Sequence, residues 1–327
     1  MMGKILELCN YNITYINKNQ NRKVYAVKNI SFEINQGDSL GIVGESGSGK
    51  TTLAMGILNL LPKNYSIIKG TANFLGENLT NYSEEDYKKI RWKELSVVFQ
   101  KSMNSLSPVH KIRTQVEDIY RVHKKYASNK EIFNRFSYLL NLVNLPERIY
   151  NLYPHQLSGG MLQRVSIALS IILNPKLLIL DESTTALDVV TQGQILDEIV
   201  KMEKEIDMTR IMITHDISVV AVSCNKVAVM YAGELMELGN VIDVLKNPKH
   251  PYTEALMASF PSLRGERRKM AAIKGFFPKL TNLDQGCIFA SRCQYTEDIC
   301  KQLKPPSIKT DERRTVNCHL YGGDIDA

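Results

Sequence analysis

Two patterns of apolar residues alternate along the chain and predict both strands and helices. The segment YAVKNISFEI, residues 25–34, alternates apolar and polar positions, which is typical of a strand with one buried face. SLGIV, residues 39–43, and LLIL, residues 177–180, are short continuous apolar runs, as in strands buried on both faces. From about residue 102 to 153 the apolar spacing changes to i, i+3, i+4, which predicts amphipathic helices. The chain is therefore expected to be an α/β protein with a parallel sheet and an inserted helical region.

A glycine-rich segment, GESGSGKTT, follows the expected strand at 39–43 and precedes the apolar helical run LAMGILNLL. Glycines let backbone amides approach an anion, and the following helix directs the positive end of its dipole toward it. This order of strand, glycine loop and helix predicts a phosphate-binding loop. Lys50 is expected to reach the β- and γ-phosphates of a nucleotide, and Thr51 to bind Mg²⁺. The candidate nucleotide ligands in the segment are Gly44, Ser46, Gly47, Gly49, Lys50, Thr51 and Thr52.

Two carboxylates follow the apolar run at 177–180. Asp181 is placed at the strand end to hold Mg²⁺, and Glu182 is placed one residue later to orient or deprotonate an attacking water. With a phosphate loop upstream, this pair predicts nucleotide hydrolysis rather than two solvated acids.

A second anion site is expected at the start of another helix. Ser158, Gly159 and Gly160 open the apolar-periodic segment that runs to Pro175, so a serine hydroxyl and open amides again meet a helix N-terminus. One chain does not need two such helix ends for one ATP. The second end is therefore expected to complete the nucleotide site of a partner molecule.

The motifs GESGSGKT, LSGGM, LLILDE and ITHD occur in this order, and together they resemble the nucleotide-binding subunit of an ATP-binding-cassette (ABC) transporter. The resemblance covers about residues 5–239. It implies a P-loop NTPase fold with a RecA-like parallel-sheet core, an antiparallel β subdomain and an inserted helical subdomain at about 102–170. It also implies ATP and Mg²⁺ as cofactors and ATP hydrolysis as the activity.

The same resemblance implies roles for four further residues. Gln100, in VVFQ, would bind Mg²⁺ and water at a strand end, and His215, in ITHD, would contact the γ-phosphate. Asp188 would lie in the loop that bridges two cassettes. Tyr15 is positioned like the aromatic residue that stacks on adenine, although Tyr11 and Tyr25 are close in sequence and core packing is the alternative for each.

Two residues depart from the general cassette pattern. Residue 161 is Met where most cassettes carry Gln, and residue 183 is Ser where Pro is usual. Neither change removes a phosphate contact, and both Glu182 and His215 are present. An active hydrolase is expected, rather than a non-hydrolysing regulatory cassette.

The tail, residues 246–327, follows the expected cassette at 1–245 and gathers four of the six cysteines of the chain. Their C-x5-C-x6-C-x17-C spacing lacks the tight knuckle of most structural zinc sites and differs from ferredoxin runs. Spacing alone therefore leaves three alternatives open: zinc, iron–sulfur, and unpaired buried thiols without a metal. The segment NPKHPYTEALMASFPSL resembles the C-terminal extension of oligopeptide and dipeptide importer ATPases. This resemblance implies a [4Fe-4S] cluster, with zinc as the alternative. The implied ligands are Cys287, Cys293, Cys300 and Cys318.

The bulk properties agree with a peripheral subunit. The N-terminus lacks the features of a secretion signal, and the apolar runs are shorter than the roughly 18 residues that a membrane span needs. The protein is therefore expected at the cytoplasmic face of the cell membrane. Family resemblance implies a sister ABC ATPase, two transmembrane permease subunits and an extracytoplasmic solute-binding protein as partners.

The expected function is ATP hydrolysis that powers import of di- or oligopeptides. An importer of nickel or a metallophore is the alternative within the family, because no residue here touches the solute. A soluble ABC ATPase acting on nucleic acid or ribosomes is disfavoured by the single cassette and by a net charge of only +7, so no nucleic-acid partner is expected.

Overall fold

The computed structural model forms two compact units. The helical unit comprises residues 1–5, 35–39 and 81–213, and the phosphate-loop unit comprises residues 6–34, 40–80 and 214–327. The residues that the structure describes are 3–17, 22–99, 106–183, 188–259, 273–281, 285–311 and 313–322.

A parallel sheet lies within the helical unit. Its strands are β6 (Leu95–Val98), β7 (Leu177–Asp181) and β8 (Thr209–Ile213), and β7 lies between the other two. Every residue of β7 and β8 is buried, which confirms that the LLIL run forms a strand covered on both faces.

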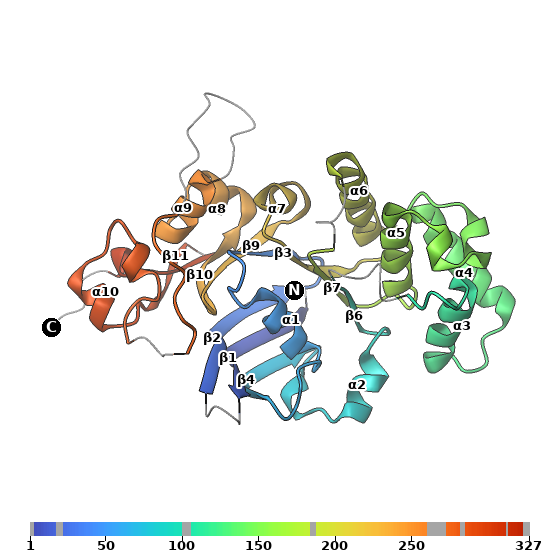
Figure 1. Cartoon of the computed structure of the whole chain (residues 1–327), viewed down its shortest axis with the longest axis horizontal. Helices are drawn as coiled ribbons and strands as arrows, with labels where there is room; N and C mark the ends of the chain where they lie inside the picture. The colour runs from blue at the N-terminus through green and yellow to red at the C-terminus, as the bar shows by residue number, and fades with distance from the viewer. Residues whose placement is uncertain are drawn as a thin grey trace. The chain divides into compact units, whose positions relative to one another are not determined.

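Helices make up most of the rest of this unit. They are α2 (Glu84–Ile90), α3 (Ile112–His123), α4 (Asn129–Leu142), α5 (Gly159–Ser170) and α6 (Val189–Glu205), with 3-10 turns at Glu147–Asn151 and Pro154–Gln156. Figure 1 shows α3, α4 and α5 grouped together, so helices form where the apolar spacing predicts them. The buried face of α4 carries Ile132, Phe136, Leu139 and Leu140, which recur at helical spacing.

A buried polar contact joins the helices that begin at LSGGM and at Asp188. Glu198 of α6 accepts hydrogen bonds from the Asn144 amide at 2.7 Å and pairs with Arg164 of α5 at 3.2 Å. Burial raises the pKa of the Glu198 carboxyl, while these two partners favour its ionised form. The pairing therefore fixes α5 against α6.

The phosphate-loop unit contains a four-stranded sheet in the order β2 (Arg22–Asn35), β1 (Lys4–Asn17), β4 (Ser66–Phe74) and β5 (Glu77–Asn78). Strands β1 and β4, and likewise β4 and β5, pair antiparallel. Helix α1 (Lys50–Ile57) packs beside this sheet in Figure 1, and Gly56 allows the close approach. A Cβ at Gly56 would lie 2.5 Å from Ile13 Cδ1.

A second group of strands carries the phosphate loop and the tail. Strand β3 (Ser39–Val43) pairs parallel with β9 (Lys226–Tyr231), and β10 (Glu234–Asn240), β12 (Arg314–Asn317) and β11 (Ser307–Asp311) continue outward by antiparallel pairing. The β3 bounds are those that the sequence predicts. Tail residues therefore extend the same sheet that positions the phosphate loop.

Short helices accompany this second group. They are α7 (Ile217–Ser223), α8 (Val241–Lys246), α9 (Pro251–Ala258) and α10 (Asp298–Gln302), with 3-10 turns at Ala290–Arg292 and His319–Tyr321. A further 3-10 turn, Leu79–Asn81, follows β5 of the first sheet. Ile288 and Phe289 of the tail are buried in one apolar cluster with Tyr231 and Tyr252. Tail and cassette thus share one core. Among the helices in the described ranges, none is long and apolar enough to cross a membrane.

Candidate functional site

The phosphate loop is held in shape by close backbone approaches that only glycine permits. Gly44 has φ +151°, and a Cβ there would lie 2.0 Å from the carbonyl oxygen of Met230. Gly49 has φ +95°, and its Cβ would lie 2.2 Å from the carbonyl oxygen of Ala26. No L side chain fits at either position without displacing the backbone.

Lys50 lies inside this loop. Its side chain is buried, and Nζ donates to the Gly44 carbonyl at 2.8 Å, to the Glu45 carbonyl at 3.0 Å and to the Ser48 hydroxyl at 3.2 Å. Because an ammonium has three donors, phosphate oxygens can replace these contacts without any change in the loop backbone. The arrangement is that of an anion site with its cation already in position.

The other candidate ligands of this loop surround Lys50. Ser46, Gly47 and Thr51 are exposed, and Thr52 is partly exposed at the start of α1. The Tyr15 hydroxyl donates to the Thr52 hydroxyl at 3.4 Å, so Tyr15 reaches the same end of α1. Tyr11, by contrast, is 1% exposed and packs in the core, which removes it as an adenine contact.

His215 also belongs to the phosphate-loop unit. The preceding residue, Thr214, donates from its backbone to the Ile42 carbonyl at 3.2 Å, so the chain here runs beside β3 just before the phosphate loop. His215 is exposed, and Asp216 then accepts from the Ser218 backbone to begin α7.

The carboxylate pair of the helical unit lies at the end of β7. Asp181 is its last residue and is buried, and Glu182 has a left-handed backbone with φ +46°. The Glu182 amide donates to the Ile213 carbonyl of β8 at 2.8 Å, which fixes this strained turn. Val98 of β6 pairs with Leu180 in parallel, so the residues after β6 lead to the same sheet edge. Gln100 itself lies outside the described residues.

The LSGGM turn and Asp188 lie together in the helical unit. Ser158 caps α5 by accepting from the Met161 amide at 3.3 Å, while Asp188 caps α6 by accepting from the Thr191 amide at 3.0 Å. The hydrogen bonds that Asp188 accepts from Thr191 hold the pKa of its carboxyl below the usual range. A Cβ on Gly160 would lie 3.1 Å from Thr191 Cγ2, so the two caps are neighbours. Ser158, Gly159 and Asp188 are all exposed.

The four tail cysteines line one narrow cavity. Cys287, Cys293, Cys300 and Cys318 share it with His250, Phe289 and other side chains. The cavity is small, with a volume of about 10 Å³. The Cys287 amide also donates to the Cys300 carbonyl at 2.7 Å.

Burial, together with repulsion from neighbouring cysteines, raises the pKa of the Cys287 thiol to about 12 and raises the pKa values of Cys293 and Cys318 as well. In the described part of the chain, no three His, Cys, Asp or Glu side chains lie close enough together to hold a single metal ion. Cys9 is exposed on β1 and Cys224 lies outside the group.

Comparisons with known proteins give the family. Residues 27–185 match the family model described as ABC transporter, and residues 236–300 match the model described as oligopeptide/dipeptide transporter, C-terminal region. The chain is 42% identical to the dipeptide transport ATP-binding protein DppD of Caldanaerobacter subterraneus subsp. tengcongensis, over 91% of this chain and 92% of that protein. It is 40% identical to the oligopeptide transport ATP-binding protein AppD of Bacillus subtilis, over 98% of both. The chain belongs to the oligopeptide/dipeptide family of ABC transporter ATP-binding proteins.

A solved structure supports the ABC fold independently. The ATP-binding cassette MJ0796, in a dimeric post-hydrolysis state bound to ADP and Pi, superposes with a TM-score of 0.64 at 28% identity, over 72% of this chain and 98% of that one. This ABC protein therefore has a cassette fold, and it is an ATPase. The ABC motifs in the sequence predicted both.

Sequence reasoning missed one set of contacts at the phosphate loop of this ABC protein. Glu45 occupies a variable position of GESGSGKT, yet its carboxylate pairs with Arg292 and its amide donates to the Tyr252 hydroxyl at 3.0 Å. Arg292 directly precedes Cys293. A separation of 247 residues leaves no local pattern that could have joined Arg292 to Glu45.

Proposed function

We propose that this ATPase powers the import of di- or oligopeptides through a membrane permease. The observation that carries the proposal is the match to peptide-transport ATPases along the whole chain, tail included. Many ABC ATPases share the cassette motifs, so residues 27–185 alone would leave the transported class open. The tail match narrows the proposal to the peptide family.

We infer that ATP binds at residues 44–52, with Tyr15 stacked on adenine. Lys50 then exchanges the Gly44 and Glu45 carbonyls for phosphate oxygens. Glu182 orients the attacking water and His215 contacts the γ-phosphate. These groups act by position and charge, as is usual in phosphoryl transfer.

Three residues would hold Mg²⁺: Thr51, Asp181 and Gln100. The donor set is chemically suitable, because hydroxyl, carboxylate and amide oxygens suit this hard cation, and Asp181 is a buried carboxylate at a strand end. When bound, Mg²⁺ would neutralise negative charge on the phosphates.

We infer that a sister ABC ATPase completes each nucleotide site. Ser158, Gly159 and Gly160 of one subunit would contact the ATP held by the phosphate loop of the other, with Asp188 at the junction. The exposure of Ser158, Gly159 and Asp188 supports this inference, because surface helix N-termini can accept an anion brought by a partner. Two permease subunits and a solute-binding protein would complete the importer at the cytoplasmic face of the membrane.

We also infer that the four cysteines hold a [4Fe-4S] cluster. Thiolates are the ligands of such clusters, and all four thiols line one cavity. Thiols with raised pKa values must release protons when a metal binds.

The transport proposal is tested by isolating tagged protein from native membranes in mild detergent and identifying every chain that co-purifies. Two multi-span permeases and a second cassette are expected. A captured solute-binding protein would then be titrated with peptides and with Ni²⁺. Binding of Ni²⁺ but not of peptides would show that the transported solute is nickel. Recovery of ribosomal or DNA-bound partners would overturn the transport role.

The cluster proposal is tested by metal and sulfide analysis of protein purified without oxygen. Stoichiometric iron and sulfide are expected in wild type and in Cys224→Ser, and loss of both is expected in Cys300→Ser. Stoichiometric zinc without iron in wild-type protein would contradict the cluster.

A further inference from the structure

Arg292 is bound to the phosphate loop by an unusually complete set of contacts. Its Nη1 lies 3.1 Å from each carboxylate oxygen of Glu45 and donates to the Tyr231 hydroxyl at 3.0 Å. Its Nε donates to the Lys274 carbonyl at 2.9 Å and its Nη2 to the Ile273 carbonyl at 3.1 Å. The Arg292 side chain is only 5% exposed. A guanidinium with so many partners has a fixed position.

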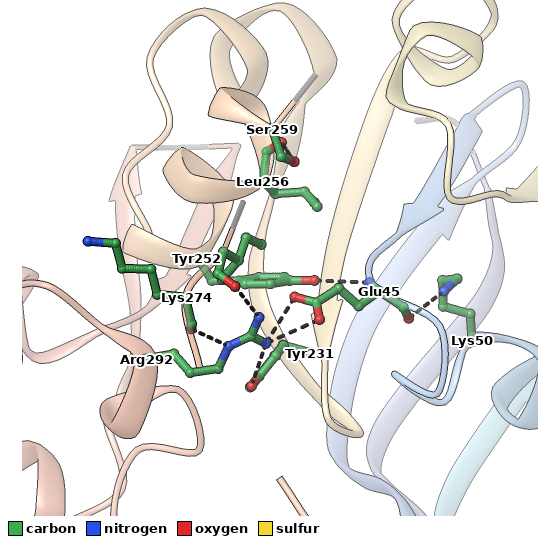
Figure 2. Close-up of polar contacts among 9 residues, drawn as sticks. Glu45, Lys50, Tyr231, Tyr252, Leu256, Ser259, Lys274 and Arg292 are labelled. Atoms are coloured by element: carbon green, nitrogen blue, oxygen red, sulfur yellow. Dashed lines mark hydrogen bonds and ion pairs between the residues drawn. The ribbon is translucent and has the colours of Figure 1, made fainter. Parts of the chain in front are cut away.

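Glu45 stands between this guanidinium and the nucleotide-site lysine. Figure 2 shows its carboxylate directed toward Arg292, while its backbone carbonyl accepts from Lys50 Nζ at 3.0 Å. The Tyr252 hydroxyl holds the backbone amide of the same residue. Arg292 and Tyr252 thus fix both the side chain and the main chain of one phosphate-loop residue.

A carboxylate in an anion-binding loop carries an electrostatic cost. An unpaired Glu45 would repel phosphate, and its backbone lies close enough to Lys50 for the free carboxylate to compete with phosphate for the ammonium. Arg292 offsets this charge and holds the carboxylate on the side away from Lys50.

We propose that Arg292 is a positioning residue of the nucleotide site, through which the tail loop between Cys287 and Cys293 sets the affinity of the phosphate loop for nucleotide. The proposal rests on the proposed nucleotide site at residues 44–52. Arg292 lies in the 3-10 turn Ala290–Arg292, directly after the buried Phe289, so the fold of the cysteine loop determines where the guanidinium lies.

The test measures binding of MgATP and MgADP to the full chain, together with KM and kcat for ATP hydrolysis. Arg292→Gln is expected to weaken binding about five-fold or more and to raise KM with little change in kcat. Glu45→Gln alone is expected to bind MgATP more tightly than Arg292→Gln does, because it removes the repelling charge. The double variant Glu45→Gln with Arg292→Gln is expected to recover binding to within about two-fold of Glu45→Gln.

Arg292→Lys provides a second variant in case Arg292→Gln does not fold. It keeps the charge but loses the planar fork, so its affinity should lie between wild type and Arg292→Gln. Thermal midpoints of all variants are compared to separate folding from binding.

Wild-type affinity in a folded Arg292→Gln variant would overturn the proposal. A double variant as weak as Arg292→Gln would also overturn it, because loss of structure and not charge would then be the cause. Lys50→Ala tests the underlying site separately. If Lys50→Ala binds MgATP normally, the nucleotide site is misassigned. If Lys50→Ala loses binding while Arg292→Gln keeps wild-type affinity, the site is correct and only the role of Arg292 is wrong.

Discussion

The phosphate loop and the LSGGM turn each end at a helix N-terminus that we propose binds an anion, but the contacts around the two helix ends differ. Lys50 is 5% exposed and is surrounded by loop carbonyls, and two glycines of the loop contact backbone directly. Ser158 and Gly159 are exposed and serve within their own chain only as a helix cap and first turn. The first region holds its cation within the loop of one chain, whereas we propose that the second acts only on the nucleotide of a partner.

The largest expected effect comes from adding a methyl group to the phosphate loop. In Gly49→Ala the new Cβ would lie 2.2 Å from the Ala26 carbonyl oxygen at a left-handed φ, so the loop must open. MgATP affinity is expected to fall about 100-fold or more. Equilibrium titration measures this, and near-normal affinity would show that the loop is not rigid.

A substitution in the LSGGM turn should lower ATP hydrolysis without lowering the MgATP affinity of the isolated chain. Ser158→Asp keeps a helix-capping oxygen but adds a negative charge where a partner's phosphate would lie. The isolated chain should bind MgATP as wild type, while steady-state hydrolysis should fall about 100-fold. Ser158→Asn, an uncharged cap, is the matched control and should keep more activity. A loss of MgATP binding in the isolated Ser158→Asp chain would contradict the partner role.

Acid should destabilise the tail side of the phosphate-loop unit. Burial lowers the pKa of His250 to about 3, whereas an unfolded histidine titrates near 6.5. The unfolded state therefore takes up a proton first, and the stability that neutral His250 contributes is lost as pH falls from about 6.5 toward 3. Between pH 7 and 5.5 the loss is about 1 kcal/mol.

Denaturant unfolding at both pH values checks this effect. His250→Asn keeps an acceptor for the Tyr252 amide at the start of α9, so the variant should fold but lose about 1 kcal/mol less on acidification. Equal losses in the two proteins would show that His250 does not cause the acid sensitivity.

The smallest effect is expected at Gly193, where, unlike at Gly49, an added methyl group meets no neighbouring atom. Gly193 lies within α6, and a Cβ there meets nothing within 4 Å. Gly193→Ala should therefore stabilise the helix by up to about 1 kcal/mol, with no change in MgATP affinity. A thermal melt measures it, and destabilisation would show an unrecognised contact at this position.

The sequence predicted those parts of the fold that depend on local patterns. The apolar runs at 39–43 and 177–180 became β3 and β7, because strands buried on both faces need continuous apolar residues. The phosphate loop could also be predicted, since its glycines and lysine all lie within the short segment 44–50. The placement of Tyr15 near Thr52, and of Tyr11 in the core, needed coordinates.

Long-range contacts could not be predicted from the chain in this way. Pairing of β12 with β10 joins residues about 80 positions apart, and the buried Arg314–Glu237 pair beside it follows from that pairing. Nothing in the local pattern of Arg292 or Glu45 identifies either as a partner of the other. Contacts of this kind depend on which segments the whole fold brings together, which no short window of sequence contains.

Peptide uptake measured with the assembled importer tests the central claim most directly. The isolated complex would be placed in vesicles with its solute-binding protein, and uptake of a labelled oligopeptide would be followed with MgATP on the side of the cassettes. Uptake is expected with wild-type protein and none with Glu182→Gln, although that variant should still bind MgATP. Uptake that persists in Glu182→Gln, or uptake of Ni²⁺ and not of peptides by the wild type, would contradict it.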